Sequence, residues 1–211
     1  MAKATNLGFP RIGAHRELKR AVEGYWKGNL TKDELLDSAH ALRNSHWREQ
    51  DELGLDLVPS NDFSFYDQVL DACAMVGAVP ERFPWDGDTV DLDTYFAMAR
   101  GLQEKDLEGE DSGVQAMEMT KWFDTNYHYI VPEFSRDTDF SLSSTKPIDE
   151  YKEAQAEGIE TRPVLIGPVS FLLLGKTQED DLDALDLLDD LLPVYAEVLQ
   201  ELSDAGCEAV Q

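Results

Sequence analysis

Cysteine and positive charge are both scarce in this sequence. It has two cysteines, Cys73 and Cys207, and neither lies in a Cys-x-x-Cys pair or at metal-ligand spacing from a histidine. This pattern predicts two buried, reduced thiols and no zinc site. No run of eighteen apolar residues is present, so no membrane-spanning helix is expected. The first six residues contain no apolar signal core, which favours a cytoplasmic protein.

The shortage of positive charge also excludes a class of partner. Lys and Arg number 18 against 43 Asp and Glu, which gives a net charge of −25. A surface this acidic repels a phosphate backbone, so we expect no nucleic-acid partner. Acidic residues concentrate in Glu104–Asp111 and Glu179–Asp190. They are interpreted as a solvated face, and a sharper hypothesis is adaptation to high salt, where carboxylates keep the surface hydrated.

Basic residues gather at the N-terminus instead. Residues 1–20 contain five Lys and Arg and one acid. Arg16, Lys19 and Arg20 are spaced three and four apart, so they share a face in the first turns of a predicted helix. Cations are unfavourable at a helix N-terminus, because its unpaired N–H groups carry partial positive charge. A bound anion reverses this, because the N–H groups and the cationic side chains then point at the same ligand. Two interpretations stay open: an anionic ligand, or pairing with the protein's own carboxylates.

Helical periodicity alternates with short apolar runs along the chain. Helices are predicted over residues 14–27, from a capping box at Thr31–Glu34 to Gly54, up to Gly77, over Leu92–Arg100, and up to Gly158. Gly101–Gln115 is predicted to be a loop. A final long helix is expected to bury one side, made of Leu182, Leu185, Leu188, Leu192, Tyr195, Leu199 and Leu202.

The apolar runs between the helices predict short strands of a parallel sheet. They are Thr5–Phe9, Leu55–Val58, part of Met117–Val131, Val164–Ile166, and Cys207 onward. Helix, glycine and short apolar strand in alternation are typical of an α/β protein whose sheet is covered by helices. Four to five such units predict a (β/α)8 TIM-barrel type of fold, of which this chain holds about the first half.

Two further segments carry residues suited to chemistry. In Glu118–Glu133, aromatic side chains alternate with Lys121, Asp124, Asn126 and His128. They can line a pocket for a flat heterocycle, or form a strand whose aromatics belong to the core. Asp62 follows the second predicted strand, where it can serve as an acid/base or as a helix N-cap.

Taken together, these segments resemble the cobalamin-independent methionine synthase family. The similarity spans nearly the whole chain and is most specific around Lys121-Trp122-Phe123. Further matches are Leu7–Ile12 with Arg16–Lys19, Tyr25–Gly28, Leu42-Arg43 with Trp47, Asp62–Leu70, Tyr95–Gly101, Pro163–Val169 and Leu192–Tyr195.

The resemblance implies a much longer protein built from two (β/α)8 barrels. Residues 1–211 would be part of the N-terminal, folate-binding barrel, while the zinc and the homocysteine site belong to a C-terminal barrel that is absent here. Such enzymes transfer a methyl group from 5-methyltetrahydropteroyltri-L-glutamate to L-homocysteine, which gives methionine. The positions carried over as binding the polyglutamyl folate are Arg16, Glu17, Leu18, Lys19, Lys121 and Asn126.

The leading hypothesis is therefore the folate-binding part of a methyltransferase. No catalytic or metal-binding residue is assigned to these 211 residues, so the chain alone is predicted to be inactive. Two alternatives stay open: a non-catalytic folate-binding module that acts with a separate C-terminal half, and a structural fragment. Asp62, Asp124 and His128 are not assigned to the substrate site.

Overall fold

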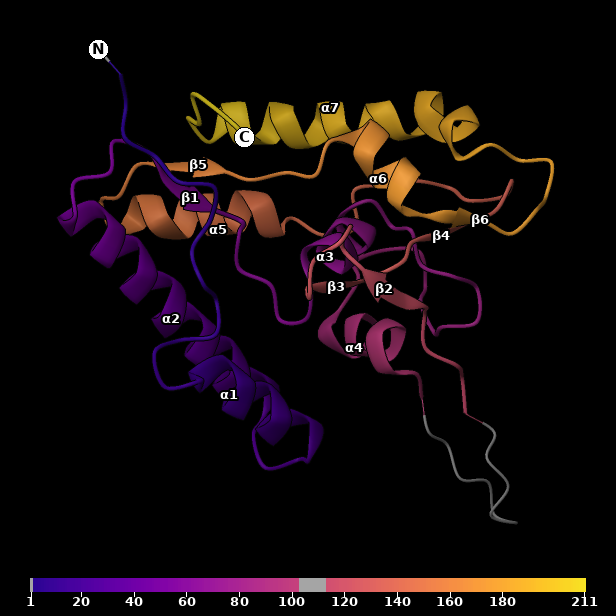
Figure 1. The fold of residues 1–211 in the computed structure, drawn as a ribbon, viewed down its shortest axis with the longest axis horizontal. Coiled ribbons are helices and arrows are strands. Elements are labelled where there is room, and N and C mark those ends of the chain that lie inside the picture. Colours follow the sequence, from indigo (N-terminus) through magenta and orange to yellow (C-terminus); the bar gives the residue numbers. More distant parts are fainter. Residues whose placement is uncertain (1, 103–112) are drawn as a thin grey trace. The chain divides into compact units, whose positions relative to one another are not determined.

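The structure is a computed structural model that describes residues 2–102 and 113–211 (Figure 1). The chain divides into two compact units. Unit 1 comprises Met1–Phe65, Lys146–Leu165 and Leu202–Gln211, and unit 2 comprises Tyr66–Thr145 and Ile166–Glu201. Within the described ranges, no helix is both long enough and apolar enough to cross a membrane.

Unit 1 combines three helices with a short parallel sheet. Its elements are α1 (Glu17–Trp26), α2 (Lys32–Glu52), β1 (Val58–Ser60), α5 (Lys146–Ala156) and β5 (Thr161–Pro163). Helices α1 and α2 lie side by side (Figure 1). Strands β1 and β5 pair in parallel, with Val58 opposite Thr161. A core cluster ties α2, β1 and α5 together through Trp47, Val58, Ala154, Ile159 and the partly buried Leu55.

The boundaries of α2 follow from local chemistry. The predicted capping box is confirmed, because the Thr31 hydroxyl accepts from the Glu34 N–H at 3.2 Å and the Glu34 carboxylate accepts from the Thr31 N–H at 2.8 Å. At the other end, Gly54 takes the left-handed conformation, with φ 83°.

Both strands of unit 1 lie three residues away from their predicted positions. The Leu55 N–H donates to the Gln50 carbonyl at 3.2 Å, so the start of the apolar run Leu55–Val58 completes the end of α2. Strand β1 therefore begins only at Val58. Val164–Ile166 follows β5 rather than forming it. The first run closes a helix before its strand begins, and the second continues past the end of its strand, which an apolar pattern alone does not distinguish.

Two other predicted strands appear only as isolated backbone pairings. Thr5 makes a single parallel bridge to Leu57 instead of beginning a strand to Phe9. At the C-terminal end, Gln211 donates to the Pro163 carbonyl at 2.9 Å and accepts from the Leu165 N–H at 2.9 Å. These two bonds flank one residue of the β5 segment, as in a parallel ladder, so strand-like bonding begins at Gln211 rather than at Cys207.

Unit 2 contains the remaining elements. They are α3 (Gln68–Met75), α4 (Leu92–Arg100), β2 (Met119–Lys121), β3 (His128–Ile130), β4 (Glu133–Phe134), α6 (Pro168–Leu174), β6 (Lys176–Thr177), the 3-10 helix η1 (Ala184–Leu187) and α7 (Leu188–Asp204), whose last three residues belong to unit 1. Strands β4 and β6 pair in parallel. Strands β2 and β3 form an antiparallel hairpin, where one strand was expected in the interval Met117–Val131.

The long final helix buries a different side from the one predicted. Leu182, Tyr195 and Leu202 are buried as expected, whereas Leu185, Leu192 and Leu199 are exposed. Leu185 belongs to η1, while Leu192 and Leu199, seven residues apart, form a stripe of α7 that borders the buried one. The buried stripe of α7 consists of Leu191, Val194, Tyr195, Val198 and Leu202. Apolar residues occupy both stripes, so periodicity alone does not identify the buried one.

The described residues form a mixed α/β structure with three two-stranded sheets and no closed barrel. The α/β class is confirmed in that form. Both cysteines are free, as predicted, but only Cys73 is buried, since Cys207 is partly exposed. Most of the predicted loop Gly101–Gln115 lies outside the described residues.

Candidate functional site

The basic segment leads into α1 through a strained residue. Arg16 is the N-cap of α1 and adopts the left-handed conformation, with φ 63° and ψ 40°. This conformation costs a non-glycine residue on the order of 1–2 kcal/mol. The Arg16 side chain is exposed and makes no hydrogen bond or ion pair within the described ranges. The backbone strain therefore coincides with a cation that has no partner among the described residues.

The four residues Arg16 to Lys19 divide into two that face solvent and two that build the turn. Leu18 is 2% exposed and belongs to the core. Glu17 folds back so that its carboxylate accepts the His15 N–H at 2.9 Å, and this backbone bonding lowers the pKa of Glu17. Lys19 is exposed and lies 3.6 Å from Glu23, one helical turn further on. Arg16 and Lys19 are thus available to a ligand, while Glu17 and Leu18 support them.

Gly13 makes the Glu17 contact possible. It has φ 80°, and a Cβ at this position would overlap the Glu17 carboxylate and approach Leu42 Cδ2 to 2.9 Å. A side chain here would displace Glu17 from the turn that precedes α1.

The segment before this turn is held to unit 1 by side chains of α2 and of the loop after β1. Asn6 donates to the Gln50 side chain at 2.8 Å, and the Phe9 N–H donates to Asp62 Oδ2 at 2.7 Å. The Phe9 ring also packs on His46, with ring centroids 4.8 Å apart. Asp62 is not the N-cap of a described helix; it anchors the Phe9 backbone, and burial raises its pKa.

A small cavity next to this anchor holds no more than one water molecule. Its volume is about 10 Å³, and its lining includes Phe9, Arg43, His46 and Asp62. Arg43 is already neutralised by Glu153, at 2.6 Å. This cluster therefore serves to hold the N-terminal segment and does not offer a substrate pocket.

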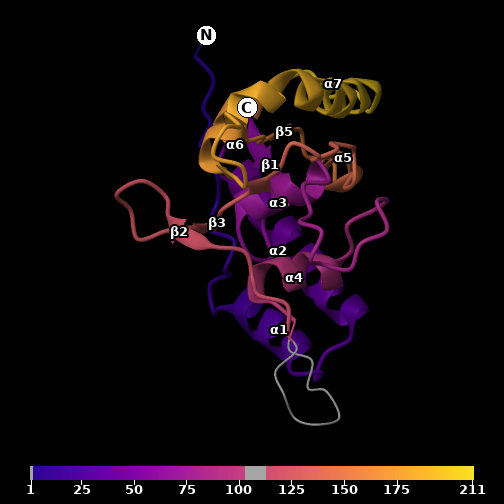
Figure 2. The ribbon, with the colours of Figure 1, turned by 90° about the vertical axis from the view of Figure 1, so that its right-hand side faces the viewer.

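Lys121 and Asn126 lie on the β2–β3 hairpin of unit 2. Lys121 ends β2 opposite His128, and Asn126 lies in the connecting loop. Both side chains are exposed and make no hydrogen bond or ion pair with the described residues. The loop extends away from α3 (Figure 2). The hairpin thus brings the two predicted residues together on one projecting turn.

The hairpin loop is ordered by its own bonds. The Trp122 N–H donates to the Tyr127 carbonyl at 2.7 Å, and the Thr125 hydroxyl donates to the Trp122 carbonyl at 2.6 Å. His128 Nδ1 lies 3.0 Å from the Asn126 carbonyl. Phe123 has a left-handed backbone, with φ 50°, and its side chain is 74% exposed.

Of the two interpretations of this segment, the core interpretation is confirmed for part of it. Tyr129 and Ile130 are buried and belong to the core of unit 2. Trp122 and Phe123 pack edge-to-face on the loop, with ring centroids 5.3 Å apart, and Phe123 is open to solvent. The loop therefore offers an exposed aromatic surface beside Lys121, while the strand supplies core residues.

The hairpin is held against α3 by residues that the sequence analysis did not single out. Asp67, the N-cap of α3, accepts the Ile130 N–H at 3.0 Å, and the Gln68 N–H donates to the Tyr127 hydroxyl at 3.4 Å. Burial raises the pKa of Asp67 to about 7, against the lowering effect of its backbone bonds. An aspartate before Val69 and Leu70 is a recognisable cap signal, but nothing in the sequence points to Ile130.

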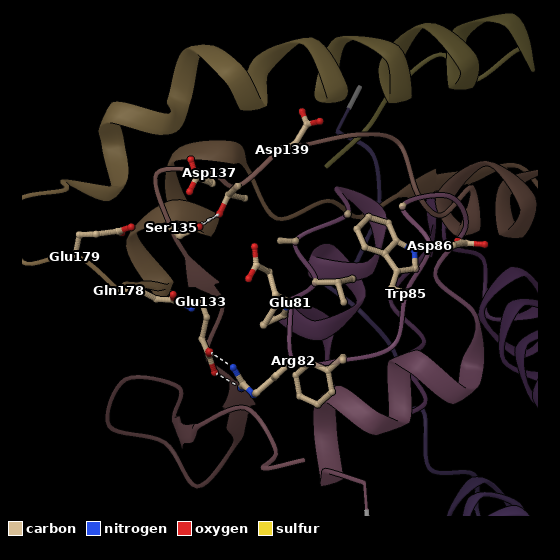
Figure 3. Close-up of a pocket in the computed structure, with 17 residues that line it drawn as sticks. Glu81, Arg82, Trp85, Asp86, Glu133, Ser135, Asp137, Asp139, Gln178 and Glu179 are labelled. Carbon is tan, nitrogen blue, oxygen red and sulfur yellow. Dashed lines mark hydrogen bonds and ion pairs between the residues drawn. The ribbon is translucent and has the colours of Figure 1, made fainter. Parts of the chain in front are cut away.

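A larger cavity of unit 2 contains none of the predicted residues (Figure 3). Its volume is about 770 Å³, and Arg82 in its wall is neutralised by Glu133 at 2.6 Å. The carboxylates around it include Glu81, Asp137, Asp139 and Glu179. A lining this acidic repels a polyanion, so this cavity does not suit the predicted ligand.

Comparison with known proteins assigns the chain to a family. The family model described as "Cobalamin-independent synthase, N-terminal domain" matches residues 3–211. The chain belongs to this family. A 5-methyltetrahydropteroyltriglutamate–homocysteine methyltransferase of Salinibacter ruber is 88% identical over 211 residues, which is 100% of this chain and 27% of that protein.

More distant members of the cobalamin-independent synthase family match over the same part of the chain at lower identity. Proteins of the same name are 56% identical in Flavobacterium johnsoniae, over 99% of this chain and 26% of the relative, and 53% identical in Saccharomyces cerevisiae, over 100% and 28%. The chain thus spans about a quarter of the length of these relatives. The resemblance inferred from the motifs is confirmed.

As part of a cobalamin-independent synthase, the chain was not expected to hold the zinc ion. Within residues 2–102 and 113–211, no group of three or more His, Cys, Asp and Glu side chains is arranged to bind a metal ion. The described residues therefore offer no set of ligands that fits a zinc ion.

Proposed function

We propose that this chain is the methyl-donor-binding part of an enzyme that transfers a methyl group from 5-methyltetrahydropteroyltri-L-glutamate to L-homocysteine, and so forms methionine. In this proposal residues 1–211 are part of an N-terminal folate-binding (β/α)8 barrel. The homocysteine site and its thiol-activating zinc belong to a C-terminal barrel outside these residues, and the enzyme is cytoplasmic. Family membership and the names of the relatives support this assignment.

The observation that carries the proposal is the state of Arg16. A strained N-cap holds an exposed guanidinium that pairs with none of the residues the structure describes, in a protein of net charge −25. A glutamate tail carries several carboxylates, and charge-assisted bonds to such groups are worth about 1.5–3 kcal/mol each. Lys19 adds a second cation on the same helix end, and Lys121 and Asn126 add a cation and an amide on the hairpin.

The chain's contribution to catalysis is binding and orientation. A methyl group on a tertiary amine is a poor electrophile, so donor and acceptor must be held in line for transfer to occur. Cations that grip the glutamate tail fix one end of the donor, while the exposed aromatic surface at Phe123 is suited to contact with a flat ring. Because the acceptor site lies elsewhere, the 211 residues alone are expected to form no methionine.

Calorimetric titration with triglutamyl and monoglutamyl 5-methyltetrahydrofolate tests the proposal. We expect Arg16→Met, Lys19→Ala and Lys121→Met each to weaken triglutamyl binding about tenfold and to affect monoglutamyl binding less. Lys27→Met is the matched control, because Lys27 is the C-cap of the same helix and pairs with the same Glu23, at 3.7 Å. Binding that is absent in the wild type, or indifferent to all three substitutions, would refute the proposed site.

A further inference from the structure

The carboxylate of Asp67 serves two elements of unit 2 at once. Asp67 is 1% exposed. Its Oδ1 accepts the N–H groups of Val69, at 2.8 Å, and Leu70, at 3.3 Å, in the first turn of α3. Its Oδ2 accepts the N–H of Ile130 at 3.0 Å, 63 residues further along the chain. One side chain therefore joins the start of α3 to the strand β3.

The Ile130 bond secures the outer edge of the hairpin. Ile130 pairs with Met119 of β2, but its N–H points to Asp67, while the next N–H, of Val131, returns to the Glu118 carbonyl at 2.8 Å. Asp67 thus accepts a bond that a neighbouring strand would otherwise take. A two-stranded hairpin is marginally stable on its own, so its position depends on such anchors.

This anchor lies close to the predicted ligand-binding groups. Lys121 is opposite His128, which is two residues from Ile130, or about 7 Å along the strand. Gln68, which follows Asp67, donates its N–H to the Tyr127 hydroxyl at 3.4 Å, and Tyr127 follows Asn126 directly. The start of α3 thereby holds β3 on both sides of the position opposite Lys121.

Capping of α3 does not by itself account for a buried aspartate. Asn and Ser cap helices about as well as Asp, and neither carries the cost of burying a charge. A carboxylate, unlike an amide or a hydroxyl, offers two oxygens that both accept. Two acceptors at this position are needed only because Ile130 is bonded as well as Val69 and Leu70.

We propose that Asp67 is a positioning residue of the methyl-donor site, which sets the place of Lys121 and Asn126 by fixing β3 to the N-terminus of α3. This inference rests on the proposed function. It assigns Asp67 no contact with the ligand, and its effect passes through the hairpin.

Asp67→Asn tests this, because asparagine keeps a cap acceptor but cannot also accept the Ile130 N–H in the same orientation. The matched control is Asp91→Asn, in the aspartate that caps α4 of the same unit by accepting the Thr94 N–H at 2.8 Å. In the complete polypeptide, we expect Asp67→Asn to weaken triglutamyl 5-methyltetrahydrofolate binding about tenfold. Asp91→Asn should leave it unchanged, and circular dichroism should show both variants folded.

A thermodynamic cycle separates positioning from a general loss of stability. In a Lys121→Met background, Asp67→Asn should cost less than about threefold in affinity, because the positioned cation is gone and only the neutral Asn126 amide remains to be misplaced. In a Lys19→Ala background, Asp67→Asn should still weaken binding by the full factor of about ten, because Lys19 does not lie on the hairpin. With the complete enzyme, the Michaelis constant for the triglutamyl donor should rise while the turnover number changes little.

The outcomes distinguish this inference from the proposed function. If the wild type binds the ligand and Asp67→Asn weakens binding by the same factor with and without the Lys121 side chain, the positioning role is overturned and the proposed function stands. If circular dichroism shows that Asp67→Asn is unfolded, Asp67→Ser, which keeps a cap acceptor, takes its place in the same thermodynamic cycle. Absence of triglutamyl binding in the wild type would overturn both.

Discussion

The N-terminus of α1 and the β2–β3 hairpin present similar groups by different means. Each exposes a cation that has no partner within residues 2–102 and 113–211, namely Arg16 at α1 and Lys121 on the hairpin. Each is anchored by a carboxylate of raised pKa that accepts a backbone N–H, Asp62 from Phe9 and Asp67 from Ile130. Both anchors are distant in the sequence, by 53 and 63 residues. At α1, however, Glu17 and Leu18, which shape the turn, also lie directly between the two exposed cations, whereas no residue of the hairpin motif takes the part of Asp67.

The difference shows how the same task can be local or long-range. At α1, a motif of four residues contains both the exposed cations proposed to bind the ligand and the side chains that shape the turn. At the hairpin, Lys121 and Asn126 are themselves exposed, and their support comes from α3. Substitutions should therefore act on the two regions in different ways.

The largest effect is expected within the α1 motif itself. Leu18→Ala removes a side chain that is 2% exposed and should lower the free energy of unfolding by about 2–5 kcal/mol. Lys19→Met, one residue away, should change it by less than about 0.5 kcal/mol. Urea denaturation of both variants measures this contrast. Equal effects would show that the motif is not divided into supporting and ligand-facing residues.

The second prediction concerns pH and applies to the hairpin anchor. Between the unfolded pKa of Asp67, near 4, and its folded pKa of about 7, the folded protein keeps a proton that the unfolded chain has lost. The free energy of unfolding should therefore fall as pH rises through this window and level off above it, by a few kcal/mol.

Comparison with Asp67→Asn isolates this contribution. The difference in unfolding free energy between wild type and variant should move in favour of the variant from pH 4 to pH 7. The titratable groups that interact with Asp67 are common to both proteins, namely Tyr66, Asp71, Cys73, Tyr95 and Tyr129. A difference that does not vary with pH would show that Asp67 titrates normally.

The third prediction asks whether the two regions bind one ligand. Arg16→Met and Lys121→Met should each weaken triglutamyl folate binding by about 1.4 kcal/mol, or tenfold. The double variant should lose about a hundredfold if both cations contact the same molecule independently. Titration at two salt concentrations provides the control, because charge contacts at exposed sites weaken with salt. A double variant no weaker than either single variant would place only one of the cations at the ligand.

Local sequence patterns predict more of the structure around α1 than of the structure around the hairpin. The capping box at Thr31, the helix of Arg16 to Lys19 and the α/β class follow from neighbouring residues, so local patterns were sufficient. The Asp67–Ile130 bond joins residues 63 positions apart, and no local pattern encodes such a contact. The exposed residues Leu185, Leu192 and Leu199 are misassigned for a related reason: leucines also border the buried stripe of α7, so the local pattern does not reveal where the buried side ends.

The smallest effect is expected at Glu23, which lies 3.6 Å from Lys19 and 3.7 Å from Lys27. Exposed pairs of this kind contribute little to stability, so Glu23→Gln should leave the melting temperature unchanged. It should nevertheless strengthen triglutamyl folate binding about twofold, because Lys19 no longer gives up an internal partner when it binds. Asp33→Gln on α2 removes an equal charge at another exposed site and should have no such effect. If both variants gained affinity equally, the gain would come from lower net charge, and α1 would hold its ligand by the overall field rather than by Lys19.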